Sequence, residues 1–169
     1  MVNLFVAEQP RPYDVGPKAR DIPDEHQVVL LDSCVWIYLF ENHPQYADLI
    51  DTMLTQWIAQ GTLLLSSELS LLEIKAGPLQ LGEESVVGEY QLYLNNFPGL
   101  HLVPIDRAII DRAARLRAHY RLKTPDALIL ATGLERGATL ALTNDRAWKA
   151  IDGIEVVCLM DPIEKRDEG

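Results

Sequence analysis

Short apolar runs alternate with segments of helical periodicity along most of the chain. A continuous apolar run of about 4–8 residues is typical of a strand buried on both faces of a parallel sheet. Five such runs occur: VVLLD at 28–32, TLLLSS at 62–67, HLVPI at 101–105, ATLALTND at 138–145 and IEVVCLM at 154–160. We therefore expect a central, largely parallel sheet of about five strands.

Helical patterns fill the intervals between these runs. We predict helices over about 34–41, 45–60, 68–77, 83–96, 107–120 and 124–137, and a short one over 146–151. Ser66 or Ser67 is a suitable N-cap for the third helix, and Gly77-Pro78 is expected to end it. Strands separated by helices predict an α/β fold with three layers, α/β/α.

The two ends of the chain differ from this pattern. Residues 1–26 contain Pro10, Pro12, Pro17 and Pro23 and little apolar periodicity, so we expect a poorly ordered arm there. Residues 27–162 form the predicted domain, and 163–169 form a charged tail. The chain has 169 residues, of which 48% are hydrophobic, which suits one domain with one core.

Four acidic residues stand at positions where carboxylates need an explanation. Asp32 and Asp145 follow predicted strands, and Asp126 lies in a first helical turn. Helix capping, or attraction to the helix dipole, would explain each of these three by itself. Glu73 is different, because it shares a helical stripe with Leu69, Leu72 and Ala76 and should face the core, where a carboxylate needs a cation.

Taken together, the four acids indicate a metal site. The carboxyl ends of neighbouring parallel strands meet at one edge of the sheet, where ligands bind in open α/β folds. Four carboxylates converging there would repel one another unless a divalent ion neutralised them, and oxygen ligands suit Mg²⁺ or Mn²⁺. Such ions activate water for attack on a phosphodiester.

The distribution of charge limits the partners. The chain has 15 Lys and Arg against 25 Asp and Glu, a net charge of −10, which argues against a generic nucleic-acid coat protein. Basic residues nevertheless gather over 107–123, and Arg112, Arg115 and Lys123 precede Asp126, so they are candidate phosphate contacts. A solvated helix face is the alternative explanation of these charges.

Other residues bear on location and on the core. Cys34 and Cys158 lie in apolar runs without disulfide or metal spacing, which indicates buried thiols in a reducing compartment. No apolar run approaches the roughly 18 residues that a bilayer requires, so we expect a cytoplasmic protein without a membrane segment. The three tryptophans, Trp36, Trp57 and Trp148, are expected in the core, and we assign no catalytic histidine.

The motifs that hold these acids resemble those of PIN-domain nucleases. They are VVLLDSCVWIY with Asp32 and Ser33, LSLLEIKAGP with Glu73, and TPDALILATGLERGATLALTNDRAW with Asp126, Thr143, Asn144 and Asp145, followed by EVVCLM. The resemblance spans about residues 28–160. It implies a PIN-like α/β/α fold and a Mg²⁺- or Mn²⁺-dependent endoribonuclease.

The same resemblance implies roles and partners. Asp32, Glu73, Asp126 and Asp145 would hold the metal and carry catalysis, with Ser33, Thr143 and Asn144 as polar support and Thr143 orienting Asp32. Small members of the family are commonly VapC-type toxins, which would give this chain an RNA substrate, a short antitoxin partner and a homodimeric state. The alternative is a catalytically silent PIN-like module that binds RNA or protein. A dehalogenase-like phosphatase is disfavoured because Cys34 stands where that chemistry needs a second Asp.

Overall fold

The computed structural model describes residues 28–161, so the predicted arm at 1–26 and tail at 163–169 lie outside the described part. Five strands form one sheet: β1 (Val28–Leu31), β2 (Leu63–Ser67), β3 (Leu100–Val103), β4 (Leu140–Thr143) and β5 (Glu155–Cys158). Their order is β3-β2-β1-β4-β5 and every pairing is parallel. The predicted parallel sheet is confirmed, and β1 lies at its centre.

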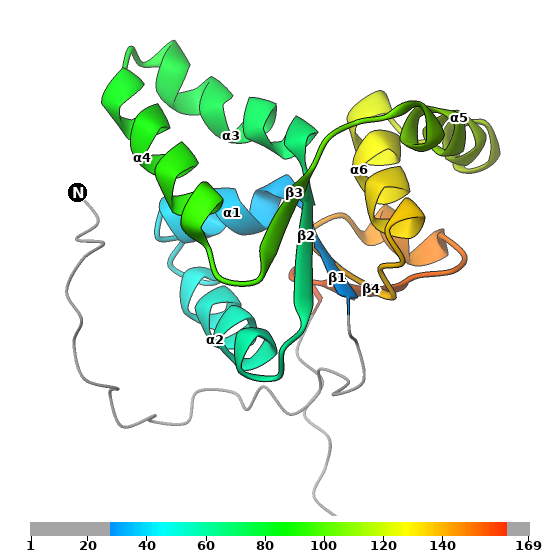
Figure 1. The fold of residues 1–169 in the computed structure, drawn as a ribbon, viewed down its shortest axis with the longest axis horizontal. Helices are drawn as coiled ribbons and strands as arrows, with labels where there is room; N and C mark the ends of the chain where they lie inside the picture. Colours follow the sequence, from blue (N-terminus) through cyan, green and yellow to red (C-terminus); the bar gives the residue numbers. More distant parts are fainter. Residues whose placement is uncertain (1–27, 162–169) are drawn as a thin grey trace, which may run out of the picture.

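Helices cover both faces of this sheet. On one side lie α1 (Ser33–Phe40), α2 (Ala47–Ala59), α3 (Glu68–Gln80) and α4 (Glu84–Asn96) (Figure 1). On the other lie α5 (Arg107–Tyr120), α6 (Thr124–Glu135) and the 3₁₀ helix η1 (Arg146–Ala150) (Figure 1). The predicted three-layer α/β/α architecture is therefore confirmed.

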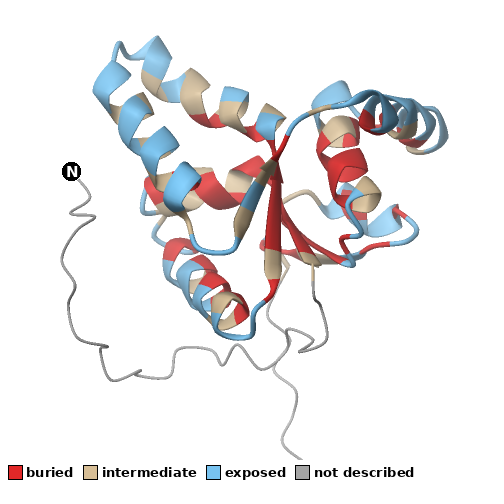
Figure 2. Ribbon diagram, viewed as in Figure 1, coloured by how far each residue is buried: buried red, intermediate tan, exposed pale blue. Residues whose placement is uncertain are grey.

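Two apolar clusters, one on each face, follow from the alternation of side chains along the strands. Leu31 and Leu64 pack with α1, α2 and α4, whereas Leu30 and Leu65 pack with α5 and α6. Buried positions line the sheet and the inner helix faces (Figure 2). The predicted core tryptophans, Trp36, Trp57 and Trp148, are all buried, with at most 1% of their surface exposed.

Helix α6 comes unusually close to β1 at Gly133. A Cβ atom at this position would lie 2.7 Å from Leu30 Cδ2 and 3.0 Å from Leu30 Cβ. The absence of a side chain therefore allows close packing of helix on strand, which fixes α6 and the acidic residue in its first turn relative to the sheet.

The predicted end of α3 is wrong. The helix does not stop at Gly77-Pro78 but continues through Pro78 to Gln80. The turn that ends it is formed at Gly82, which has a φ of +73°, a conformation that glycine adopts without steric cost. The amides of Leu81 and Glu83 donate to the Pro78 carbonyl and close this turn.

The predicted core-facing stripe of α3 is also wrong in part. Leu72 is 64% exposed, and the buried line of the helix runs through Ser70 and Ile74 instead. The helix lies between the two apolar clusters, with Leu71 packed against one and Leu69 against the other. This rotation leaves Glu73 half-buried at the flank of the helix rather than in the core.

Two further predictions concern cysteines and membranes. Cys34 and Cys158 are both free thiols, Cys158 buried and Cys34 half-buried. Among the helices of residues 28–161, none has the length and apolar character needed to cross a bilayer.

Candidate functional site

Asp32 follows the central strand and caps α1. Its Oδ1 accepts a hydrogen bond from the Ser33 backbone N–H at 2.7 Å, so the capping role considered from sequence is present. Its Oδ2 accepts one from the Thr143 hydroxyl at 2.6 Å. Only 7% of the residue is exposed. The carboxylate is therefore held rigidly at the carboxyl end of β1.

Thr143 links two of the candidate acids. It is the last residue of β4, the strand beside β1, and it is fully buried. While its hydroxyl donates to Asp32, the same oxygen accepts the backbone N–H of Asp145 at 3.1 Å. Asp145 in turn caps η1 by accepting the Ala147 N–H at 2.8 Å. One hydroxyl thus fixes Asp32 and the start of the Asp145 turn.

Glu73 joins the group through Ser33. The Ser33 hydroxyl donates to Glu73 Oε2 and lies 3.2 Å from Asp32 Oδ1, so one buried hydroxyl stands between the two carboxylates. This contact connects α3 to the start of α1, although the two residues are 40 positions apart. Glu73 therefore faces the site from the flank of its helix.

Asp126 completes the acidic group from the first turn of α6. Burial raises its pKa, and the charges of Asp32, Asp145 and Glu73 raise it further. The cation of Lys123 opposes this rise. Asp126 therefore lies at the same end of the sheet as the other three acids, which Ser33 and Thr143 join by hydrogen bonds.

The pKa of Asp32 is also raised, chiefly by burial, and less by the charge of Glu73. Hydrogen bonds from Thr143 and Ser33 oppose this rise because they stabilise the ionised form. A buried carboxylate with acidic neighbours is a position that a divalent cation would relieve. Ionising Asp32 and Asp126 therefore costs free energy in the absence of a cation, and a bound cation would offset this cost.

The donor set fits a hard cation. It consists of carboxylate and hydroxyl oxygens, which Mg²⁺ and Mn²⁺ prefer. Within residues 28–161, no three Asp, Glu, His or Cys side chains are arranged to hold one ion among them. Mg²⁺ commonly uses one or two carboxylates with water and substrate oxygens as its other ligands, and a loosely spaced acidic group suits that mode.

Asn144 has a partner that the sequence does not indicate. Its side-chain amide donates to the Tyr38 hydroxyl at 2.7 Å, which ties the Thr143–Asp145 segment to the second turn of α1. The Tyr38 ring stacks on Tyr46, with ring centroids 5.2 Å apart. No local pattern pairs a residue of α1 with one that follows β4, so Tyr38 was missed.

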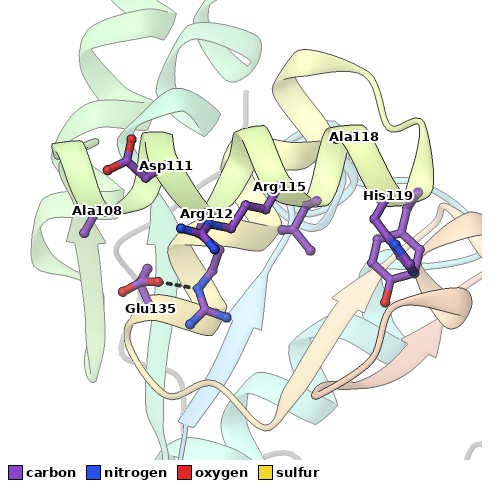
Figure 3. A pocket seen from close by; sticks show the side chains of 9 residues that line it. Ala108, Asp111, Arg112, Arg115, Ala118, His119 and Glu135 are labelled. Carbon is purple, nitrogen blue, oxygen red and sulfur yellow. Dashed lines mark hydrogen bonds and ion pairs between the residues drawn. The ribbon is translucent and has the colours of Figure 1, made fainter.

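The three basic candidates do not lie together. Arg112 forms an ion pair with Glu135, near the end of α6, and Arg115 lies on the same groove, whose volume is about 970 Å³ (Figure 3). Glu135 is about 13 Å along the axis of α6 from Asp126, at a rise of about 1.5 Å per residue. Lys123, by contrast, precedes α6 and acts electrostatically on Asp126.

Comparison with known proteins identifies the family of the chain. The PIN domain family model matches residues 29–154, which is most of the chain. The chain belongs to the PIN domain family. No protein of curated function matches it.

Solved structures of toxin-antitoxin systems share the fold. VapBC2 from Rickettsia felis, bound to a promoter DNA fragment, is similar with a TM-score of 0.65 and 17% identity, covering 78% of this chain and 98% of that one. A toxin-antitoxin complex from Klebsiella pneumoniae has a TM-score of 0.61 and 23% identity over 80% and 99%. The sarcin-ricin loop cleaving toxin VapC20 of Mycobacterium tuberculosis has a TM-score of 0.61 and 13% identity over 76% and 98%. At these identities the likeness concerns the fold.

Proposed function

We propose that this PIN domain protein is a Mg²⁺- or Mn²⁺-dependent endoribonuclease. The observation that carries the proposal is the hydrogen-bonded acidic group at the carboxyl edge of the sheet. Ser33 joins Glu73 to Asp32, Thr143 joins Asp32 to the Asp145 turn, and Asp126 senses the charge of the other three acids. A structural role for each acid separately would not require them to meet. Carboxylates that gather at the carboxyl edge of a parallel sheet, with the pKa of Asp32 and Asp126 raised by burial, are typical of a functional site.

In this proposal, Asp32, Glu73, Asp126 and Asp145 would hold the metal ions, with one or two carboxylates on each ion, and orient the reacting groups. A bound ion would neutralise the acids, polarise the phosphate and lower the pKa of a coordinated water. Thr143 and Ser33 keep the Asp32 carboxylate in one orientation through their hydrogen bonds. Asn144, anchored on Tyr38, holds the segment that presents Asp145.

We further propose that the protein is the toxin of a type II toxin-antitoxin pair, with a small antitoxin partner and a homodimeric state. The similar structure from Klebsiella pneumoniae, which is described as a toxin-antitoxin complex, and that of VapBC2 from Rickettsia felis support the antitoxin partner. The two unpaired cysteines support a location in the reducing cytoplasm. A PIN-like module that binds RNA or protein without cleaving it is the second candidate.

Nuclease activity is tested by incubating the full chain with single-stranded RNA of mixed sequence, with Mn²⁺ or with a chelator. We expect cleavage only with the metal, and none from Asp32→Asn. Asp48→Asn is the matched control, since it makes the same chemical change at an exposed residue of α2. Equal cleavage by Asp32→Asn and wild type would exclude this site, and binding without cleavage would favour the silent module.

Toxin status needs a separate experiment in cells. We expect expression of the chain in a bacterial host to stop growth, and coexpression of any small gene encoded beside it to restore growth. The Asp32→Asn variant should be harmless at the same expression level. Normal growth with wild-type protein of proven nuclease activity would reject the toxin role and retain the enzyme.

A further inference from the structure

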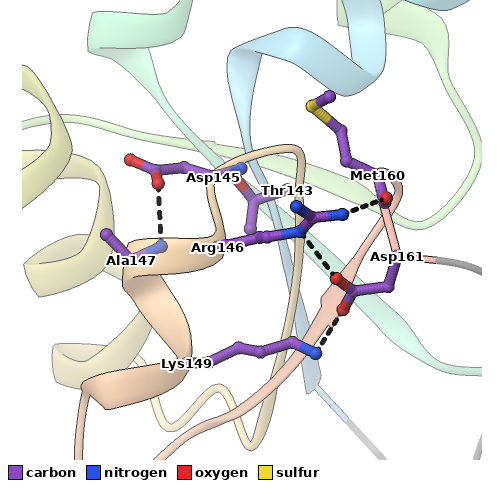
Figure 4. Close-up of polar contacts among 7 residues, drawn as sticks. All are labelled: Thr143, Asp145, Arg146, Ala147, Lys149, Met160 and Asp161. Atoms are coloured by element: carbon purple, nitrogen blue, oxygen red, sulfur yellow. Dashed lines mark hydrogen bonds and ion pairs between the residues drawn. The ribbon is translucent and has the colours of Figure 1, made fainter.

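Two cations follow Asp145 directly, and both contact one carboxylate. Arg146 Nε donates to Asp161 Oδ1 at 2.9 Å, and its Nη2 donates to the Met160 carbonyl at 2.7 Å. Lys149 Nζ pairs with the other oxygen, Asp161 Oδ2. These contacts connect η1 to the segment that follows β5 (Figure 4).

The side chains of Arg146 and Lys149 are accessible, and their contacts given above are all with Met160 and Asp161. The side chains of Arg146 and Lys149 are 62% and 49% exposed, and that of Asp161 is 27% exposed. Ion pairs at this exposure contribute little free energy because water and salt screen them. A polyanion that reaches η1 can therefore compete with Asp161 for both side chains.

Arg146 and Lys149 lie at the edge of the candidate site, beside Asp145, and these two residues are called the rim below. Arg146 is the next residue after Asp145, so the two Cα atoms are about 3.8 Å apart. The Asp145 carboxylate points to the α6 side, whereas Arg146 extends toward the end of β5 (Figure 4). A nucleic-acid strand that places one phosphate at the acids and runs on toward the end of β5 would carry its next phosphates past Arg146 and Lys149. The predicted phosphate contacts Arg112 and Arg115 lie on α5, and Arg112 pairs with Glu135 at the end of α6 opposite to Asp126.

We propose that Arg146 and Lys149 bind backbone phosphates of the RNA next to the scissile position, and that Asp161 competes with the RNA for them. This inference rests on the proposed nuclease function. Asp161 holds the two flexible side chains of the rim in the free protein and gives them up when the strand binds. The carboxylate therefore weakens RNA binding, although it stabilises the free protein.

A purely structural role predicts the opposite response. If the contacts of Asp161 serve only to hold η1 and Asp145 in place, then removing its charge should loosen the site and weaken both binding and cleavage. If Asp161 competes with phosphate, the same change should strengthen binding. The sign of the change in affinity separates the two roles.

The test measures the affinity of a fluorescein-labelled single-stranded RNA of mixed sequence at several salt concentrations, with Ca²⁺ replacing Mn²⁺ to limit cleavage. We expect Asp161→Asn to bind about two- to fivefold more tightly, the factor that corresponds to a surface ion pair. Arg146→Gln and Lys149→Gln should bind more weakly, each with a slope of log affinity against log salt reduced by about 0.7. Thermal unfolding of each variant verifies folding.

Asp106→Asn is the matched control. It breaks the exposed Arg136–Asp106 ion pair, whose N···O distance is 2.8 Å, and changes the net charge by the same amount. That pair lies at the far end of α6 from Asp126, so it should leave RNA affinity unchanged. An equal gain in Asp106→Asn and Asp161→Asn would assign the effect to net charge and overturn the inference.

The remaining outcomes separate this inference from the proposed function. Wild-type protein that neither binds nor cleaves RNA would reject the nuclease itself. Wild-type protein that cleaves RNA, together with unchanged affinity and salt dependence in Arg146→Gln and Lys149→Gln, would reject only the rim contacts. Weaker binding by a folded Asp161→Asn would establish the structural role and reject the competition.

Discussion

The hydroxyl of Thr143 donates a 2.6 Å hydrogen bond to the buried carboxylate of Asp32, across 111 positions of sequence. The contact exists because β1 and β4 are neighbouring parallel strands, so their carboxyl ends lie side by side. It ties the candidate acid on the central strand to the segment that carries Asp145. Four predictions follow from this part of the molecule and from the packing around it.

Replacing Thr143 with valine should remove the hydrogen bond with little change of shape. The Asp32 carboxylate would lose a donor in a buried position, so we expect a loss of about 1–3 kcal/mol in the free energy of unfolding. Cleavage of RNA should fall about 10–100-fold, the usual effect of removing a group that orients a metal ligand. Denaturant unfolding and Mn²⁺-dependent cleavage assays measure the two effects.

Thr132→Val is the control for this substitution. Thr132 is also fully buried, but its hydroxyl donates to the Leu128 carbonyl within α6, at 2.8 Å. Its loss should lower stability and leave the activity of the folded protein unchanged. If both variants lose activity equally, the effect comes from destabilisation and not from the orientation of Asp32.

Asp32→Asn should stabilise the protein when divalent ions are removed. Burial raises the pKa of Asp32 above its unfolded value of about 3.9, so the folded state retains a proton more strongly. Stability is then greatest below the unfolded pKa and decreases as pH rises through the folded one. The uncharged amide avoids this loss, and Tm at neutral pH should rise by about 2–4 °C for each kcal/mol recovered.

The measurement is a series of thermal unfolding curves with chelator between acidic and neutral pH. We expect the Tm of wild type to fall more steeply with rising pH than that of Asp32→Asn. Adding Mn²⁺ should then stabilise wild type, by about 2.7 kcal/mol at 100 times the dissociation constant, and not the variant. Equal stabilisation of both proteins by Mn²⁺ would place the ion elsewhere.

Gly133→Ala should destabilise the fold through the contact of α6 with β1. The added methyl group would lie 2.7 Å from Leu30 Cδ2, so either the buried Leu30 side chain or the helix must shift. We expect a cost of about 1–3 kcal/mol, as for other overpacked cores. Gly88→Ala in α4 is the comparison, because no atom of another element lies within 4 Å of its added methyl group, and the helix should gain about 0.5–1 kcal/mol.

Chemical denaturation of the two glycine variants decides between packing and helix propensity. A gain in stability in both would mean that α6 can shift at no cost. In that event Asp126 would not be fixed relative to Asp32 by the close approach at Gly133.

Lys123→Gln should weaken RNA binding more than Arg112→Gln. Lys123 acts on Asp126, whereas Arg112 is occupied by Glu135 at the other end of α6. If Lys123 contacts one phosphate, the slope of log affinity against log salt concentration should be smaller by about 0.7 in Lys123→Gln. The same loss in Arg112→Gln and none in Lys123→Gln would place the RNA along the groove of α5 instead.

Much of the fold could be predicted from local patterns. The apolar runs gave all five strands within a few residues, and the helix over 107–120 has the predicted bounds, because strand and helix periodicities depend on residues near in sequence. The misplaced end of α3 shows where such signals compete. Gly77-Pro78 is a strong local stop, yet the helix continues to the turn at Gly82.

The candidate site was predictable as a set of residue types, not as a set of contacts. Sequence alone placed acids after two strands and in a first helical turn, and parallel strands must bring such positions to one edge. The pairs Ser33 with Glu73 and Asn144 with Tyr38 connect segments that no pattern relates. The core-facing stripe assigned to Leu72 failed for the same reason, since packing against two apolar clusters sets the rotation of α3.

The sequence by itself therefore determined the order of strands and helices along the chain, the buried apolar positions on the strands and the identity of the candidate acids. Only the tertiary structure decided which hydroxyl holds Asp32, which end of α6 receives Arg112 and which cations lie beside Asp145. The physical reason is the separation in sequence of the residues that interact. Periodicity arises from neighbours within a few residues, whereas side-chain partners depend on how distant elements pack.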